Sequence, residues 1–358
     1  MSGTVGDNVG RGSGVIASAG TGATVSASDP TISTNPSSVG VEWINSTSGE
    51  TWICTDITAG ENVWKSTGTH SSGAIQPIPD FLGDRGLFPC GHPSSRVNVD
   101  YVSISSLGDG SDFGDMTVGR YAPAAGSSGS RMVVGGGNPV PVKNEIDYVT
   151  ISSLGDGSDF GDLTVARYES SCLTNGTRGV WGGGAEGTDV IDYVTLSSIG
   201  DASDFGDLLG NKAGGPAGSN GTRGVFGASI TDVIEYITIT SLGDAVDFGD
   251  QIVSEDWRNG CSDGTKMLIG GGGAASYTDA IEYITISSTG DGADFGDLTQ
   301  ARAGTGSCSD GTKVLFGAGY LGSNSDVIDY VTVASLGDAS DFGDLTTGYR
   351  YTTGCSGT

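Results

Sequence analysis

Basic residues are scarce in this sequence, and their scarcity excludes two classes of partner. Among 358 residues, 16 are Lys or Arg and 43 are Asp or Glu, which gives a net charge of −27. A surface this acidic repels nucleic-acid phosphates and anionic lipid headgroups. We therefore expect no nucleic-acid partner and no membrane insertion.

Long apolar segments are missing as well. No apolar run approaches the roughly 20 residues that a membrane-spanning helix needs. The first 20 residues, MSGTVGDNVGRGSGVIASAG, contain no apolar core of the kind found in signal peptides. No heptad pattern predicts a coiled coil. The sequence thus predicts neither a membrane span, nor a cleaved leader, nor a helical stalk.

Glycine, in contrast, is abundant, and it accompanies a repeat. Gly accounts for 64 residues, with no collagen-like triplet period. The tetrapeptide Asp-Phe-Gly-Asp recurs at 112–115, 159–162, 204–207, 247–250, 294–297 and 341–344. A tyrosine precedes each copy, at Tyr101, Tyr148, Tyr193, Tyr236, Tyr283 and Tyr330. The chain therefore contains one unit repeated six times.

Each unit is predicted to form four short strands. In the copy that ends at Leu208, we expect strands over Thr164–Cys172, Arg178–Gly183, Val190–Ser197 and Ser203–Leu208, with a twist or bulge near Val194. Four strands in about 45 residues is the pattern of a propeller blade. Four cysteines recur at similar places in the copies, Cys172, Cys261, Cys308 and Cys355, and we expect free, buried thiols there.

The ends of the repeat array predict how it closes. The first copy begins at the second strand, within Asp84–Phe88, and the last copy adds one more first strand, Thr346–Cys355. One blade would then combine both ends, which removes an open sheet edge. We therefore expect an all-β, six-bladed β-propeller over 81–358, closed by the C-terminal strand. An open array is the alternative, but no capping repeats are visible.

Most charges belong to this repeated scaffold. Each copy carries three acids spaced three apart, such as Asp156, Asp159 and Asp162, and one base at the start of its second strand. We expect these charges to pair within or between blades. Ca²⁺ could use such carboxylates, but the spacing is not that of an EF-hand loop, and turn-capping aspartates are the favoured interpretation. No cofactor or metal is predicted.

The first 80 residues differ from the repeats. Residues 1–35 are rich in Gly, Ser, Thr and Ala and are predicted to be an extended attachment arm. Residues 36–80 are predicted to hold a small β-hairpin module and a linker. Its strands are Val41–Ile44 and Thr51–Cys54, and its core is Trp43, Trp52 and Trp64. About 30 residues bury little on their own, so we expect this module to associate with a partner or with copies of itself.

The repeat resembles a known family. Its Gly-Gly-Gly after the second strand, its Ile-Asp-Tyr-Val-Thr-Ile phrase and its closing Asp-Phe-Gly-Asp-Leu resemble the kelch-like repeat of structural proteins from marine bacteriophages, including those of cyanobacteria. Residues 35–65 resemble a short module that recurs in phage virion proteins. The resemblance implies a virion component, commonly a tail fibre or another appendage, assembled in the cytoplasm of the bacterial host.

Specific function is expected where the repeats differ. The six loops after the second strands vary most: His92–Val97, Asn138–Asn144, Ala185–Asp189, Ser229–Asp232, Ala274–Thr278 and Tyr320–Ser325. The candidate ligand-binding residues within them are Lys143, Tyr277, Tyr320 and Asn324. For the two tyrosines the reason is that an exposed aromatic ring can stack on a sugar. Trp43, Trp52 and Trp64 are candidates for attachment to other virion proteins.

Three functions follow as hypotheses. The first is an appendage that binds a host-surface glycan or protein, as a homo-oligomer for which a trimer is one candidate. The second is a purely architectural part of the capsid, collar or tail. The third, an enzyme, is disfavoured, because His70 and His92 are the only histidines. A copper-oxidase site or a Ser-His-Asp triad is therefore not predicted, and no carboxylate pair stands out from the repeated acids.

Overall fold

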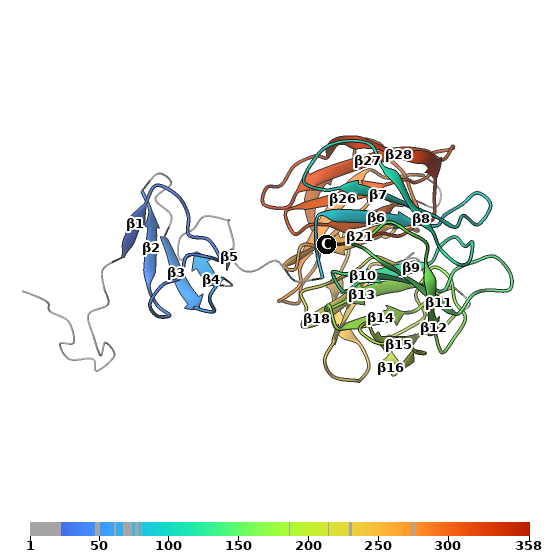
Figure 1. Cartoon of the computed structure of the whole chain (residues 1–358), viewed down its shortest axis with the longest axis horizontal. Helices are drawn as coiled ribbons and strands as arrows, with labels where there is room; N and C mark the ends of the chain where they lie inside the picture. The colour runs from blue at the N-terminus through green and yellow to red at the C-terminus, as the bar shows by residue number, and fades with distance from the viewer. Residues whose placement is uncertain are drawn as a thin grey trace, which may run out of the picture. The chain divides into compact units, whose positions relative to one another are not determined.

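The chain folds into two units built from strands. The computed structural model describes residues 23–46, 51–60, 62–66, 74–75, 79, 81–185, 187–213, 215–228, 231–273 and 276–358. Met1–Pro77 forms one compact unit and Ile78–Thr358 the other (Figure 1). The elements found in these ranges are all β-strands, and no helix there is long and apolar enough to cross a membrane.

The first unit is a five-stranded sheet in chain order: β1 (Thr24–Ser26), β2 (Glu42–Asn45), β3 (Thr51–Asp56), β4 (Val63–Ser66) and β5 (Ala74–Ile75). The antiparallel pairing of β2 with β3 confirms the predicted hairpin. Trp52, Trp64 and Cys54 form its buried core, with Trp43 packed against them.

The arm is predicted to extend to residue 35. This is wrong for residues 23–35, which are bound to the sheet. Strand β1 pairs in parallel with β2. The Asp29 carboxylate accepts hydrogen bonds from the Asn45 amide (2.7 Å) and from the Trp52 indole N–H (3.3 Å). These side-chain partners bind 23–35 to the sheet despite a composition typical of linkers. Residues 1–22 of the predicted arm lie outside the described residues.

The second unit contains six four-stranded antiparallel sheets. The first strands are β9 (Ala124–Ser127), β13 (Ser171–Thr174), β17 (Ala217–Ser219), β21 (Asn259–Ser262), β25 (Gly306–Ser309) and β29 (Cys355–Gly357). The second strands are β10 (Arg131–Gly135), β14 (Arg178–Gly182), β18 (Arg223–Phe226), β22 (Lys266–Gly270), β26 (Lys313–Gly317) and β6 (Arg85–Pro89).

The third and fourth strands complete each sheet. The third strands are β11 (Glu145–Thr150), β15 (Val190–Thr195), β19 (Val233–Thr238), β23 (Ala280–Thr285), β27 (Ser325–Thr332) and β7 (Asn98–Ser103). The fourth strands are β12 (Ser158–Asp162), β16 (Ser203–Asp207), β20 (Val246–Asp250), β24 (Ala293–Asp297), β28 (Ser340–Tyr349) and β8 (Ser111–Asp115).

In the copy that ends at Leu208, the predicted second, third and fourth strands are confirmed, and the predicted first strand is wrong. Strands β14, β15 and β16 agree with prediction to within two residues, whereas β13 begins at Ser171 instead of Thr164. The bulge lies between Ile191 and Asp192, not near Val194. Similarly, Thr346–Cys355 is not one strand, because β28 continues to Tyr349 and β29 begins at Cys355. A buried arginine explains the late start of β13, as described below.

The sheets contact one another through their first strands. Strand β9 contacts β13, β13 contacts β17, β17 contacts β21 and β21 contacts β25. Strand β29 contacts both β25 and β9, and it pairs with β6 through Cys355, Ser356 and Gly357. Strand β28, near the C-terminus, contacts β7 and β8 (Figure 1). The C-terminal strand β29 and the first-copy strands β6, β7 and β8 thus form one sheet.

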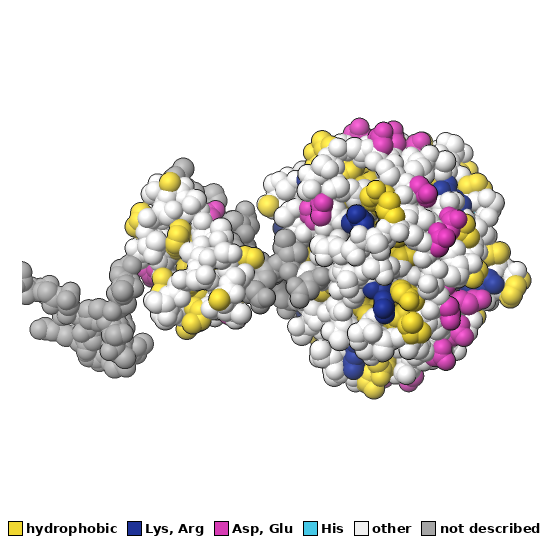
Figure 2. All heavy atoms as spheres, viewed as in Figure 1, with side chains coloured by type: hydrophobic (Ala, Val, Ile, Leu, Met, Phe, Trp, Pro, Cys, Tyr) yellow, Lys and Arg dark blue, Asp and Glu magenta, His cyan; other side chains and the backbone are white. Residues whose placement is uncertain are grey.

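The aspartate triplets connect neighbouring sheets. The first Asp of each triplet accepts a hydrogen bond from the backbone N–H of the third Asp in the preceding copy, as in Asp115 to Asp156 (3.1 Å). The same bond recurs for Asp162–Asp201, Asp207–Asp244, Asp250–Asp291, Asp297–Asp338 and Asp344–Asp109. The last bond joins the final copy to the first. Acidic side chains gather in groups toward the edge of the second unit in the view of Figure 2.

The repeated base has a different partner from the one predicted. Arg131 donates to the carbonyl of Leu196 in the next sheet (2.7 Å) and lies over the Tyr148 ring at 4.5 Å. That tyrosine makes an edge-to-face contact with Phe160 of the Asp-Phe-Gly-Asp motif. The base therefore joins sheets through a carbonyl and a ring, instead of through an aspartate.

The buried ion pairs come from another set of residues. Arg120 and Asp147 are both buried and 2.5 Å apart, and Arg120 also donates to two backbone carbonyls. The equivalent pairs are Arg167–Asp192, Lys212–Glu235, Arg258–Glu282 and Arg302–Asp329. Each cation precedes the first strand of its sheet. The segment that carries the cation is held by these buried contacts and is not part of the first strand.

Candidate functional site

The two ends of the sheets carry different kinds of connection. In an antiparallel sheet, the turns from first to second and from third to fourth strand lie at one end. The loops from second to third strand lie at the other, together with the segments that lead into the next first strand. The variable loops predicted to carry function therefore share one end of the second unit, which we call the loop end. The opposite end is the turn end.

The chain enters the second unit at the turn end. Phe81 is buried, and its ring atoms lie close to the turn residues Gly176 and Gly221. Pro79 approaches Gly264, which belongs to the equivalent turn of another sheet. The segment before the first sheet is thus held against the turns, which leaves the loop end free of it.

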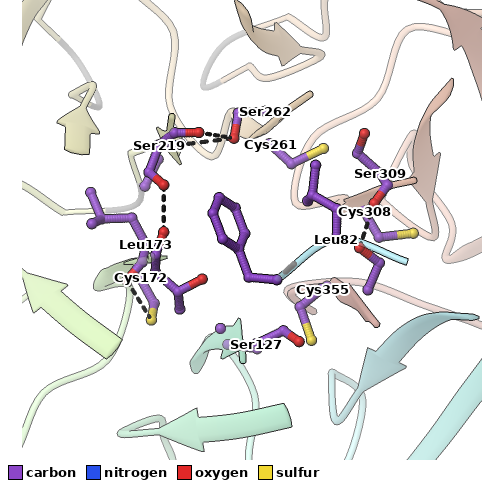
Figure 3. Close-up of a pocket in the computed structure, with 18 of the residues that line it drawn as sticks. Leu82, Ser127, Cys172, Leu173, Ser219, Cys261, Ser262, Cys308, Ser309 and Cys355 are labelled. Carbon is purple, nitrogen blue, oxygen red and sulfur yellow. Dashed lines mark hydrogen bonds between the residues drawn. The ribbon is translucent and has the colours of Figure 1, made fainter. Parts of the chain in front are cut away.

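The space between the first strands holds a small cavity. Figure 3 shows serine and cysteine side chains from several of these strands around it, among them Ser127, Cys172, Ser219 and Cys308. Phe81 and Leu82 also line it, and its volume is about 70 Å³. That is far below the several hundred Å³ of ordinary ligand pockets. Desolvation raises the pKa of the Cys261 thiol to about 12. All six cysteines are free; of the four repeated ones, Cys308 and Cys355 are buried as predicted, whereas Cys172 and Cys261 are only partly buried. This cavity is structural.

At the loop end, backbone hydrogen bonds among the described residues link equivalent positions of five sheets in an open series from Glu169 to Trp257. The backbone N–H of Glu169 donates to the carbonyl of Ala122, and the N–H of Ala122 donates to the carbonyl of Tyr351. In the same way Tyr351 donates to Gly304 and Gly304 donates to Trp257, with N–O distances of 2.7–3.0 Å. All five have φ between 52° and 66°, a left-handed conformation that is uncommon for a bulky residue. Held there, the five positions present unequal side chains: Ala, Glu, Trp, Gly and Tyr.

The large side chains of this series contact one another. The rings of Trp257 and Tyr351 are 5.0 Å apart, edge to face. The Trp257 indole N–H donates to the Glu169 carboxylate at 3.3 Å, although the two residues belong to sheets that are not neighbours. Desolvation raises the pKa of Glu169, opposed by this hydrogen bond. Half-buried aromatic and acidic groups thus meet where the sheets converge.

Loop residues extend this group outward. The centre of the Tyr351 ring lies 6.4 Å from the centre of the Tyr121 ring and 6.3 Å from that of the His92 ring. Arg350 lies over the rings of Tyr320 (4.1 Å) and Tyr351 (5.2 Å), and Tyr320 contacts Tyr277 edge to face at 5.9 Å. We call this set the aromatic cluster: His92, Tyr121, Glu169, Trp257, Tyr277, Tyr320, Arg350 and Tyr351.

The structure brings some of the predicted site residues together. Tyr277 and Tyr320 belong to the aromatic cluster, and the Asn324 side chain accepts a hydrogen bond from Arg350 at 3.0 Å. Lys143 instead pairs with Glu145 at 3.7 Å. Trp52 and Trp64 are buried in the first unit, so these two attachment candidates form a core and offer no contact surface. Only Trp43 of the three is partly exposed.

Sequence reasoning missed the residues that lead into the first strands. Glu169, Trp257 and Tyr351 were hidden inside a segment predicted to be a regular strand. Their signal is present in the sequence nevertheless. The left-handed position lies two residues after Arg120, Arg167 and Arg302 and one residue before Arg258. The residue at this position differs between copies, whereas the surrounding scaffold repeats. A search for positions that break the repeat would have found them.

A larger hollow lies elsewhere on the loop end. Arg96, Asp100, Asp112 and Thr347 line a space of about 570 Å³. Asp100 is 1% exposed and is equivalent to Asp147, but Tyr349 takes the place of the cation, and its hydroxyl lies 3.3 Å from the carboxylate. Desolvation raises the pKa of Asp100, while hydrogen bonds from Thr346 and Tyr349 and the charge of Arg96 oppose the shift. Within the described ranges, no group of three His, Cys, Asp or Glu residues is arranged to hold a metal ion.

No known protein-family model and no curated protein matches this sequence.

Proposed function

We propose that the second unit is a closed six-bladed β-propeller of the kelch-like kind. Three observations support closure: the contacts of β29 with β25 and β9, its pairing with β6, and the hydrogen bond from Asp344 to Asp109. The pairing with β6 and the bond from Asp344 to Asp109 each join the last copy of the repeat to the first, and the contacts of β29 place it between β25 and β9. In this proposal the aromatic cluster lies around the propeller axis.

We further propose that the protein is a bacteriophage virion component, a tail fibre or another appendage, assembled as a homo-oligomer in the host cytoplasm. The resemblance of its repeat and of residues 35–65 to phage structural proteins supports this proposal. The first 80 residues would attach it to other virion proteins. The linker enters at the turn end, so the loop end is the face available for display.

The displayed face would bind a host-surface glycan through the aromatic cluster. One observation carries this proposal: five equivalent backbone positions bear unequal side chains, and the large ones converge. A scaffold role would be served by the same residue in every sheet, as it is at the aspartate triplets. Aromatic rings with polar edges suit sugars, which combine apolar faces with hydroxyl groups. Binding without a reaction is proposed, since the chain has only two histidines.

A glycan array probed with the full chain tests this. The wild type should bind a subset of glycans, and Trp257→Ala and Tyr351→Ala should each weaken that binding by about tenfold or more, as expected for a central aromatic contact. Leu242→Ala, an exposed change at the turn end, is the matched control and should bind like the wild type. If both aromatic variants bind normally, the cluster is not the site.

The second candidate, a purely architectural role, has its own supporting observation. An apolar side chain is exposed in the turn from third to fourth strand in five copies: Leu107, Leu154, Ile199, Leu242 and Leu336. These side chains share the turn end with the linker and would suit contact with the particle body. Substituting them should reduce incorporation into particles without changing glycan binding, whereas the cluster variants should do the reverse.

A further inference from the structure

We infer that Arg350 recognises the carboxylate of an acidic sugar, an inference that rests on the glycan-binding function proposed above. Most cations of the second unit already have a structural partner. Five are paired with buried carboxylates, and the second-strand bases, of which Arg131 is typical, donate to carbonyls of the neighbouring sheet. Arg350 belongs to neither set.

Arg350 is held in place without an acidic partner. Its backbone exchanges two hydrogen bonds with His92, at 2.8 and 3.0 Å. Its guanidinium lies over the rings of Tyr320 and Tyr351, and one nitrogen donates to Asn324. In the part of the chain that the structure describes, no carboxylate lies within ion-pair distance of it, and its buried Nε–H has no acceptor. A positioned cation without an acidic partner is thus present in a chain of net charge −27.

The geometry favours a planar anion over a neutral group. A guanidinium held against two rings cannot rotate freely, so it presents its N–H groups in a fixed fork. That fork matches both oxygens of a carboxylate. The neighbouring rings of Tyr277, Trp257 and Tyr351 supply surfaces for the sugar that carries the acid. Because the rest of the chain repels anions, selectivity must come from this local arrangement.

The first test compares matched acidic and neutral glycans. The full chain is probed with a panel of uronic-acid oligosaccharides, their methyl esters, and sulfated oligosaccharides of equal charge. Wild type should bind at least one acid about 10- to 100-fold more tightly than its ester, the range expected for a charge-assisted hydrogen bond. Added NaCl should reduce this preference. A sulfated partner that binds as well as the acid would overturn the carboxylate assignment.

The second test uses variants. Arg350→Gln should lose the preference for acid over ester, and Arg350→Lys, which keeps the charge without the fork, should recover only part of it. Lys65→Gln, an exposed change in the first unit, removes the same charge and should preserve the preference. Should Arg350→Gln fail to fold, Asn324→Ala removes only the acceptor that orients the guanidinium and should reduce the preference severalfold.

The inference and the proposed function can fail separately. If wild type binds neutral glycans through Trp257 and Tyr351 but no acid more tightly than its ester, the inference is overturned and the glycan-binding function remains. If Arg350→Gln keeps the full preference, the acid is recognised elsewhere. If no glycan binds at all, both are overturned.

Discussion

At the scale of single residues, the acid on the third strand shows how this repeat uses charge. Asp147 accepts from the buried guanidinium of Arg120, and four other sheets have the same kind of pair. Asp147→Asn would leave that guanidinium buried without a counter-ion. We expect a loss of about 3–5 kcal/mol in the free energy of unfolding, measured by urea titration.

Asp100 provides the matched comparison, because Tyr349 occupies the place of the cation there. Burial raises its pKa above the usual carboxyl value, so the folded state binds this proton more readily than the unfolded state. Its contribution to stability is therefore greatest at low pH and falls as the pH rises from about 4 through the raised pKa.

Asp100→Asn should consequently remove part of this decline in stability with rising pH. At neutral pH it should lower the free energy of unfolding much less than Asp147→Asn does. Urea midpoints measured between about pH 4 and 7 test this. Equal losses for the two variants at pH 7 would show that Asp100 also has a stabilising counter-ion.

The sequence predicted which residues belong to the scaffold better than it predicted their contacts. The repeated Tyr, Phe and Asp positions could be assigned to the scaffold because they occur in every copy. Their partners could not be assigned, since the contacts cross between strands and between sheets. Arg131 was expected to pair with an acid, but it donates to Leu196, which lies 65 residues further along the chain.

At the scale of secondary-structure elements, the short C-terminal strand has a large expected effect. Strand β29 contributes only Cys355–Gly357, yet it is the first strand of the sheet that begins with β6. A chain that ends at Gly354 should lose at least about 3 kcal/mol of stability, from strand hydrogen bonds worth roughly 1 kcal/mol each together with the lost burial.

Thermal unfolding followed by circular dichroism measures this loss, with removal of Thr358 alone as the control. An unchanged midpoint for the chain that ends at Gly354 would show that β29 does not hold the two ends of the array together.

Strand boundaries were predictable where a repeated pattern of apolar residues marks the strand. The second, third and fourth strands follow repeated apolar patterns, so their ranges agreed with prediction to within two residues in the copy that ends at Leu208. The first strand did not, because its preceding segment is shaped by a buried cation and by a left-handed residue such as Glu169. Neither feature leaves a periodic signal, and the aromatic cluster lies in that segment.

At the scale of the whole molecule, negative charge is concentrated enough to affect stability. The third Asp of a triplet has a raised pKa in five copies, at Asp162, Asp207, Asp250, Asp297 and Asp344. Desolvation is the main cause, followed by the charges of neighbouring acids. Since the folded state holds these protons more tightly, the carboxylates oppose folding increasingly as the pH rises above the usual carboxyl range.

Salt should therefore stabilise the protein at neutral pH. We expect the thermal midpoint at pH 7 to rise when NaCl is increased from about 10 mM to about 200 mM, because the Debye length then falls well below the width of the molecule. The rise should be smaller near pH 4, where more of these acids are protonated. A midpoint that falls with salt at pH 7 would mean that favourable ion pairs outweigh the repulsion.

Locating the chain on the intact particle tests whether the aromatic cluster is displayed for binding. Electron cryomicroscopy of the virion should place the loop end, with Trp257 and Tyr351, outward at the distal part of an appendage and open to solvent. A map in which another virion subunit covers that end, or in which the chain is absent, would contradict the account.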